Sequence, residues 1–303
     1  MPDATLNHVP GMKDAAAVPV LDAQDLSESD FLENYVFNSR PCVIKGAVRH
    51  WPAIEKWRDT DYLKRLCGHH KIAFSPHEYH LTVKRNDVGR QIMSFAEALD
   101  RFQAEETKTA IATSPHPSAL QPDTGGFSFL TKADAALTYP PLRYFFYRNA
   151  GTTWHYHPFD ETLMCQIVGQ KKIGLLNVDA RSHQSVFGVF VKEDYYDDPS
   201  VFDGIDTSGL NWFSATLDEG DALYIPQMWW HGVSTISEAF GATAAASFRS
   251  PLPVLANAIR KMASGEVVMV GMTDAYDEFR RIFDIAAKMG LGNELVTAWK
   301  RGL

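Results

Sequence analysis

Basic residues, cysteine and long apolar runs are all scarce in this chain. Its 303 residues include 29 Lys and Arg against 37 Asp and Glu, which gives a formal net charge of −8 at pH 7. Surfaces that bind nucleic acid or anionic membranes need an excess of basic side chains, so we expect neither partner. No apolar run approaches the roughly 20 residues that cross a bilayer. Residues 1–18 also lack the basic-then-apolar layout of a signal peptide.

Cysteine occurs three times, as Cys42, Cys67 and Cys165. The number is odd and the positions are far apart, which is not the pattern of a disulfide framework. We therefore expect buried free thiols in a reducing compartment. Together with the missing export and membrane signals, this predicts a soluble cytoplasmic protein.

The composition is that of an ordinary globular protein, with 45% hydrophobic and 22% charged residues. We expect a helix over 27–37, capped by Ser27 with Ser29 as the alternative, because its apolar residues share one face. The other elements expected before residue 142 are a strand over 40–46, helices over 57–66 and 93–102, and a loop rich in Pro and Gly over 113–126.

From residue 142 to 248 the pattern changes to short strand-like runs separated by Gly, Pro and Asp. This pattern predicts a β-barrel or sandwich. The segment 192–212, rich in Asp, Tyr, Gly and Ser, interrupts it as a long insert that we expect to shape specificity. The strand-like runs are 143–148, 162–168, 172–177, 222–225 and 241–248.

Helical spacing returns after residue 250, with apolar stripes over 255–262 and 276–286. Asn293 could cap a last short helix. These helices either cover the barrel or pair with a second subunit. We therefore divide the chain into a domain over 1–250, with an N-terminal α/β part over about 18–141 and a barrel core over about 142–250, and a helical segment over 251–303.

The spacing of three histidines indicates a metal site. His155 and His157 stand two apart in Gly151-Thr-Thr-Trp-His-Tyr-His157, so both side chains leave the same face of a strand. His231 follows far downstream, at the end of Gly220-Asp-Ala-Leu-Tyr-Ile-Pro-Gln-Met-Trp-Trp-His231. Three imidazoles from two strands can hold a divalent first-row metal and leave positions open for substrate or water.

The middle ligand has two candidates. The best-known oxygenase triad of this type contains a carboxylate, and Asp160 and Glu161 lie just beyond His157, past Pro158. A carboxylate could swing in if the chain loops there, whereas His157 has the strand spacing. We take His157 as the expected ligand, with Asp160 as the alternative.

These residues resemble the Jumonji-C and cupin-like family of iron(II)- and 2-oxoglutarate-dependent oxygenases over residues 18–250. The resemblance implies a mainly β protein with flanking helices, built on a double-stranded β-helix, the jelly-roll barrel of cupins. It rests on four ordered segments: Arg40-Pro-Cys-Val-Ile-Lys-Gly-Ala-Val-Arg-His-Trp-Pro52, Thr152-Thr-Trp-His-Tyr-His157, Gln166-Ile-Val-Gly-Gln-Lys-Lys172 and Gly220 to His231.

By position, the resemblance makes His155 and His231 metal ligands, and makes Lys171 and Thr152 the residues that bind the distal carboxylate of 2-oxoglutarate. A lysine ammonium beside a carboxylate forms a charge-assisted hydrogen bond. The chain departs from the family pattern at His157, where the family usually has aspartate. Three neutral imidazoles leave the site one negative charge poorer, which alters redox behaviour and co-substrate binding.

Some other residues have two readings. Arg249 either holds the co-substrate or makes a surface salt bridge. A further set of side chains either lines a pocket or belongs to the core, and it consists of Tyr144, Phe146, Arg148, Trp154 and Trp212.

The expected function is that of an oxidoreductase, an iron(II)- and 2-oxoglutarate-dependent dioxygenase that hydroxylates a small molecule or a protein side chain. Two alternatives stay open. One is a three-histidine cupin metalloenzyme that does not use 2-oxoglutarate, and the other is a binding protein that kept the barrel and lost the chemistry. A homodimer through the C-terminal helices is the expected assembly.

Overall fold

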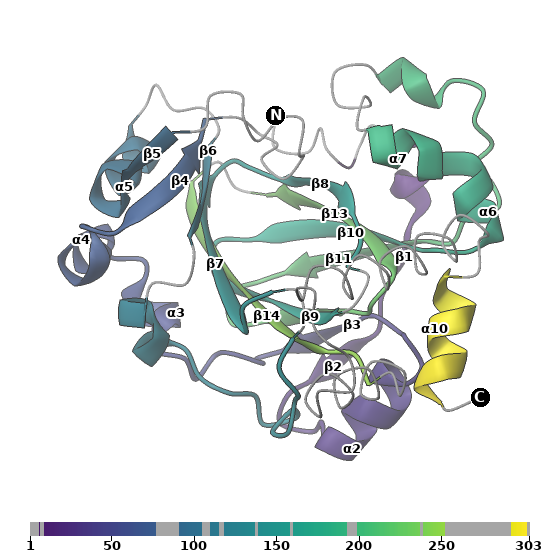
Figure 1. Ribbon diagram of the computed structural model, residues 1–303, viewed down its shortest axis with the longest axis horizontal. Helices are drawn as coiled ribbons and strands as arrows, with labels where there is room; N and C mark the ends of the chain where they lie inside the picture. Colours follow the sequence, from purple (N-terminus) through teal and green to yellow (C-terminus); the bar gives the residue numbers. More distant parts are fainter. Residues whose placement is uncertain are drawn as a thin grey trace, which may run out of the picture.

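Two β-sheets face each other and form the body of the chain in the computed structural model (Figure 1). The structure describes residues 6, 9–76, 91–104, 110–114, 118–136, 139–157, 160–192, 199–236, 239–251 and 292–301.

The smaller sheet has five strands in the order β1-β11-β10-β13-β8, which are Ala16–Ala17, Trp212–Leu217, Lys171–Asn177, Trp229–Thr235 and Thr152–His155. The larger sheet has nine strands in the order β2-β3-β12-β9-β14-β7-β6-β4-β5. Their bounds are Val20–Asp22, Cys42–Lys45, Ala222–Ile225, Asp160–Val168, Phe240–Arg249, Leu142–Arg148, Ala110–Ser114, Lys71–Ser75 and Gln91–Ser94.

Apolar side chains from both sheets meet between them. Ile173 and Val233 come from the five-stranded sheet, and Val43 and Leu223 come from the nine-stranded one. Alternate residues of a strand point to opposite faces, so each strand gives one set of side chains to this interior. The predicted cupin-type barrel, mainly β with flanking helices, is confirmed.

Short helices pack outside the nine-stranded sheet. The helix expected over 27–37 is α2 (Glu28–Phe31) continued by the π-helical turn η2 (Leu32–Val36). Ser27 caps it, because its hydroxyl accepts the backbone N–H of Asp30 at 3.1 Å.

Two other helix predictions were wrong at their starts, because capping residues decide where a helix begins. The helix expected over 57–66 is α4 (Thr60–Cys67), which the Asp59 side chain caps, and a separate short helix, α3 (Ala53–Lys56), precedes it. Ser94 caps α5 (Phe95–Gln103), so Met93 belongs to strand β5.

The expected loop over 113–126 is partly structured. Its first residues belong to β6, which pairs with β4 and β7, and a 3-10 helix, η3 (Ser118–Asp123), follows. The remaining short helices are η1 (Met12–Asp14), α6 (Ala180–Ser182), η4 (His183–Phe187), α7 (Gly188–Lys192) and η6 (Pro199–Phe202).

The C-terminal helix α10 (Gly292–Lys300) lies beside the barrel (Figure 1). Asn293 is inside its first turn and is not its cap, which corrects the prediction. The stripes over 255–262 and 276–286 lie outside the described residues, as does part of the insert over 192–212. The boundary at residue 250 and the dimer stay predictions.

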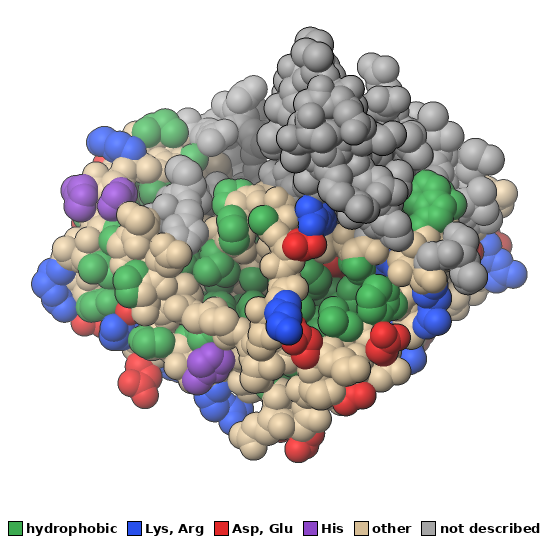
Figure 2. Space-filling model, turned by 60° about the horizontal axis from the view of Figure 1, so that its bottom comes forward, with side chains coloured by type: hydrophobic (Ala, Val, Ile, Leu, Met, Phe, Trp, Pro, Cys, Tyr) green, Lys and Arg blue, Asp and Glu red, His purple; other side chains and the backbone are tan. Residues whose placement is uncertain are grey.

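The three cysteines are buried and free, as expected. In the part of the chain that the structure describes, no helix is long and apolar enough to span a membrane. On the face shown in Figure 2, acidic and basic side chains are interspersed and do not gather by sign.

Candidate metal centre

The three predicted histidines come together at one end of the five-stranded sheet. His155 of β8 pairs directly with His231 of β13, and His157 follows two residues beyond His155. One ligand atom from each ring lies within 4.8 Å of the other two. The ring centroids of His155 and His231 are 4.1 Å apart, and that of His157 is 5.3 Å from the first and 4.9 Å from the second. The cluster can hold one metal ion.

A β-bulge brings a fourth predicted residue to the same face. His155 pairs with His231, whereas Thr152 pairs with Val233, so three steps along β8 match two steps along β13. Residues three apart on a regular strand would point to opposite faces, and a bulge removes that difference. Thr152 and His155 therefore both sit opposite inward-facing residues of β13.

Hydrogen bonds orient the imidazoles. Nδ1 of His155 donates to the carbonyl of Thr153 at 2.8 Å, and Nδ1 of His231 donates to the carbonyl of Trp229 at 3.0 Å. A carbonyl only accepts, so each ring carries its proton on Nδ1 and presents the lone pair of Nε2. Nδ1 of His157 lies 2.8 Å from the hydroxyl of Thr162. All three rings thus have an outer partner at Nδ1.

Burial keeps these imidazoles neutral. It lowers the pKa of His155 to about 4 and lowers the pKa values of His157 and His231 well below the usual value. The neighbouring histidines and Arg143 lower them further, because positive charges placed together repel. Neutral imidazole is the form that binds a metal, so the cluster is ready to bind one at pH 7.

Neither carboxylate beyond His157 belongs to the cluster. Thr162 contacts His157, so Glu161 points to the other face of β9. There its carboxylate accepts hydrogen bonds from the Tyr224 hydroxyl at 2.7 Å and from the backbone N–H of Gln227 at 3.0 Å. Asp160 is fully buried but is not among the three grouped side chains. The geometry favours His157 over Asp160.

Paired substitutions test this choice. His157→Ala is expected to weaken iron(II) binding by at least about 100-fold, since it removes one of three ligands and so exceeds the effect of losing an outer partner. Asp160→Asn is expected to leave the affinity close to the wild-type value, because the carboxylate lies outside the cluster. Iron titration of both purified variants measures this. The reverse ranking would make Asp160 the ligand.

Lys171 is buried, unlike its half-buried neighbour Lys172. Its side chain begins β10, and Nζ lies 4.1 Å from the centroid of the Tyr147 ring. Burial lowers the pKa of Lys171 to about 7. Among the ion pairs of the described residues, none includes Lys171. A buried ammonium without a carboxylate is costly, so this place suits an anionic ligand.

Two threonines near Lys171 also make this place suitable for an anionic ligand. Thr235 pairs with Lys171 across β13 and β10, and Thr152 pairs with Val233 two residues away on β13. The hydroxyls of Thr152 and Thr235 are buried and have no hydrogen-bond partner among the residues that the structure describes. Buried hydroxyls in proteins are nearly always paired, so these two have capacity for a ligand. The predicted pair Lys171 and Thr152 thus lies at one end of three adjacent strands.

Sequence reasoning missed Tyr147 and Arg143, which occupy the inner face of β7. The Tyr147 hydroxyl accepts the side-chain amide of Gln166 at 2.7 Å, beneath the Lys171 ammonium. The Arg143 guanidinium stacks on Tyr139 at 3.7 Å, and its charge lowers the pKa of each histidine of the cluster. The alternation along 143–148 shows two faces but does not say which one is inside.

The other candidates belong to the framework. Arg249 forms an ion pair with the exposed carboxylate of Asp134, so it makes the surface salt bridge that was the second alternative. Arg148 donates to the carbonyl of Phe102 at 2.8 Å, on the outer face of β7. Four aromatic residues are buried in hydrophobic clusters and not in a pocket, namely Tyr144, Phe146, Trp154 and Trp212.

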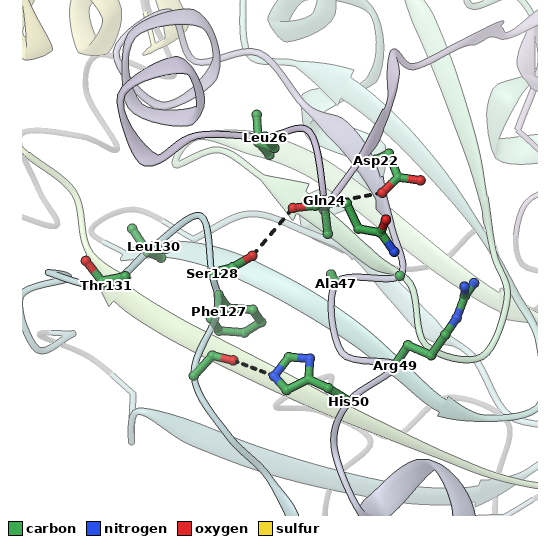
Figure 3. A pocket seen from close by; sticks show the side chains of 13 residues that line it. Asp22, Gln24, Leu26, Ala47, Arg49, His50, Phe127, Ser128, Leu130 and Thr131 are labelled. Atoms are coloured by element: carbon green, nitrogen blue, oxygen red, sulfur yellow. Dashed lines mark hydrogen bonds between the residues drawn. The ribbon is translucent and has the colours of Figure 1, made fainter.

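A separate pocket of about 1120 Å³ lies beside β2 and β3 (Figure 3). Its rim includes Asp22, Arg49 and His50, and the ring of His50 lies 3.2 Å from the carbonyl of Gly126. None of the three clustered histidines lines it.

Comparison with known proteins agrees with this geometry. The sequence profile of the cupin-like domain matches residues 28–249. Lysine-specific demethylase JMJ30 of Arabidopsis thaliana is 24% identical over 234 residues, which cover 70% of this chain and 51% of that protein. Jumonji C domain-containing protein 5 of Drosophila melanogaster is 23% identical over 240 residues, covering 74% of this chain and 58% of that protein.

A shorter match is closer in sequence. The human bifunctional peptidase and (3S)-lysyl hydroxylase JMJD7 is 35% identical over 57 residues, which are 19% of this chain and 17% of that protein. The chain spans about half the length of the first two relatives. With the family profile matched over most of its length, and with Jumonji-C proteins among its relatives, the chain belongs to the Jumonji-C and cupin-like family.

Proposed function

We propose that this protein is an iron(II)- and 2-oxoglutarate-dependent oxygenase that hydroxylates a C–H bond of a protein side chain or a small molecule. The observation that carries the proposal is the pairing of two features in one barrel. Three neutral histidines converge at one place. A buried lysine without a carboxylate partner among the described residues lies on a neighbouring strand.

His155, His157 and His231 would hold the iron. Neutral imidazole nitrogen is a good ligand for iron(II), and three protein ligands leave open positions on the metal. When bound, the metal and 2-oxoglutarate together supply the oxidising chemistry. The chain contributes the Nδ1–H bonds that orient the rings of His155 and His231, so that each presents Nε2 to the metal.

Lys171 and Thr152 would bind the distal carboxylate of 2-oxoglutarate. The ammonium forms a charge-assisted hydrogen bond, and the free hydroxyl of Thr152 donates a second one. Apolar side chains such as Ile173 and Val233 continue the interior beside them and keep water away from the carboxylate. Low polarity strengthens the ion pair, because solvent screening is weak there.

The names of two relatives bear on the substrate class. JMJ30 is named a lysine-specific demethylase, and JMJD7 is named a lysyl hydroxylase and peptidase. Both names refer to protein or peptide substrates, which favours a protein side chain for this chain. The low sequence identity and the partial coverage keep a small molecule as the other option.

One observation favours a second candidate function, a three-histidine metalloenzyme that does not use 2-oxoglutarate. The middle residue of the cluster is His157, where the family usually has a carboxylate. The metal then keeps one more positive charge, which alters its potential and its affinity for the co-substrate.

Succinate formation separates the two functions. The iron-loaded protein is incubated with 2-oxoglutarate and oxygen, with and without candidate peptides, and succinate and oxygen consumption are measured. We expect succinate in both cases, more slowly without substrate. Oxygen consumption that needs a substrate but no 2-oxoglutarate would favour the second candidate. A protein that binds iron and produces neither result would be a binding protein.

A further inference from the structure

Helix α10 contacts both chain segments that carry the histidine cluster. We propose that α10 positions the metal ligands, with Asn293 near its start and Lys300 at its end as positioning residues. The inference rests on the proposed metal site and extends it to a part of the chain outside the matched domain, which ends at residue 249. Figure 1 shows α10 beside the barrel, reaching from the side of α6 to that of α2.

Asn293 braces the turn before His231. Its backbone N–H donates to the carbonyl of Val178 at 3.1 Å. Its side-chain amide, oriented to satisfy both neighbours, donates to the carbonyl of Met228 at 2.9 Å and accepts the indole N–H of Trp229 at 3.0 Å. Asn293 is buried, so these bonds are shielded from water.

The turn that Asn293 braces holds two of the three histidines. The carbonyl of Trp229 accepts the Nδ1–H of His231, and the backbone N–H of Met228 donates to the carbonyl of His157 at 2.9 Å. Met228 has a φ of 63°, a left-handed conformation that a side chain rarely adopts. A strained turn persists only when surrounding contacts stabilise it, and the hydrogen bonds of the Asn293 amide are such contacts.

The start of α10 packs tightly against Met228 and Val178. A Cβ atom at Gly292 would lie 2.9 Å from Cε of Met228 and 2.9 Å from Cγ1 of Val178. Only glycine permits this approach, which brings the neighbouring Asn293 within hydrogen-bonding distance of the turn.

Lys300 anchors the other end of the helix. Its ammonium forms an ion pair with Glu161 in which both side chains are fully buried, and it donates to the carbonyl of Val36 at 3.1 Å. Glu161 follows His157 by four residues and also accepts the backbone N–H of Gln227, which precedes Met228. The carboxylate therefore joins α10 to both ligand segments.

A buried ion pair adds little net stability, because desolvation offsets the attraction. It does fix one arrangement, since a shift of the helix would leave two buried charges unpaired. Together the two ends of α10 hold the 157–161 and 227–229 segments at one spacing, which sets the distance between the Nε2 atoms of His157 and His231.

Cobalt(II) titration of the full chain tests this inference through visible absorption, which reports the ligand geometry without turnover. Asn293→Ala is expected to weaken cobalt binding by roughly 10- to 100-fold, the size of effect seen for partners of metal ligands. It should also change the position and intensity of the cobalt bands. Glu294→Gln, an exposed position on the same helix, is the matched control and should match wild type.

Lys300→Met leaves the Glu161 carboxylate buried and unpaired, and this variant is prone to unfold. The double variant Lys300→Met with Glu161→Gln removes both charges, so it should recover thermal stability while its cobalt spectrum stays altered. Recovered stability together with an altered spectrum would show that the ion pair positions the metal ligands and does not act only on folding.

If Asn293→Ala and the double variant both bind cobalt with wild-type affinity and spectrum, the inference is overturned, whatever their melting temperatures. A wild-type protein that does not bind cobalt at all would instead overturn the proposed metal site, and this inference with it.

Discussion

Replacing His231 with alanine is expected to abolish stoichiometric iron binding and all turnover. The residue supplies one of three imidazoles whose ligand atoms lie within 4.8 Å, and it comes from a different strand than the other two. Its loss leaves two ligands on one short segment, and we expect the metal affinity to fall by at least about 100-fold, beyond the effect of an outer partner.

The measurement is the shift in melting temperature that added iron(II) or cobalt(II) produces. A metal that binds the folded state alone raises this temperature, and the shift grows with concentration over Kd. Wild type should show the shift and His231→Ala should not. His50→Ala is the control, because His50 is exposed and is not among the clustered histidines. An unchanged shift in His231→Ala would mean that the metal binds elsewhere.

Replacing Lys171 with methionine is expected to weaken 2-oxoglutarate binding by roughly 10- to 100-fold, since a hydrogen bond to a charged group contributes about 1.5–3 kcal/mol. The same substitution should stabilise the ligand-free protein, because it removes a buried ammonium that has no carboxylate partner among the described residues. Calorimetric titration with 2-oxoglutarate, on protein loaded with a redox-inert metal, measures the first effect. Thermal unfolding measures the second.

The lowered pKa of Lys171 determines how stability and co-substrate affinity change with pH. Burial lowers the pKa of Lys171 to about 7 from its ordinary 10.5, so between these values the unfolded chain holds more protons than the folded one. Stability from this group therefore rises as pH goes from about 7 towards 10.5 and is lost as pH falls through 7. Wild-type affinity for the dianion should fall above pH 7, where the free protein loses the ammonium proton. Both trends should be absent in Lys171→Met.

Lys172→Met is the matched control for Lys171→Met. Lys172 is the next residue and is only half-buried, so the control removes the same charge from a more exposed side chain. It should change neither co-substrate affinity nor the pH trends. Equal behaviour of the two variants would show that Lys171 does not hold the co-substrate, and the three-histidine metalloenzyme would become the better function.

Local backbone geometry made parts of the site predictable. Residues two apart leave one face of a strand, so the spacing of His155 and His157 predicted that both belong to one cluster of possible ligands. The strand-like runs from 143 to 248 correspond to strands of the structure, because alternation and turn residues are local signals. The order of the family segments added His231, Lys171 and Thr152, which no spacing rule connects.

Contacts between distant segments decided the rest. Alternation along β7 could not tell that Arg143 and Tyr147 face the interior, since that depends on which strands flank it. The same holds for Glu161, which the pairing of β9 turns towards Tyr224 and away from His157.

The sequence by itself determined the family, the strand pattern and the residue types that can bind a metal and an acid, because these depend on local spacing and ordered motifs. Only the tertiary structure decided that Lys171 is buried, that Asn293 contacts Met228 and Trp229, and that Lys300 pairs with Glu161. Burial and pairing arise when strands and helices far apart in the chain pack together, and hydrophobic periodicity does not record which partner each face will meet.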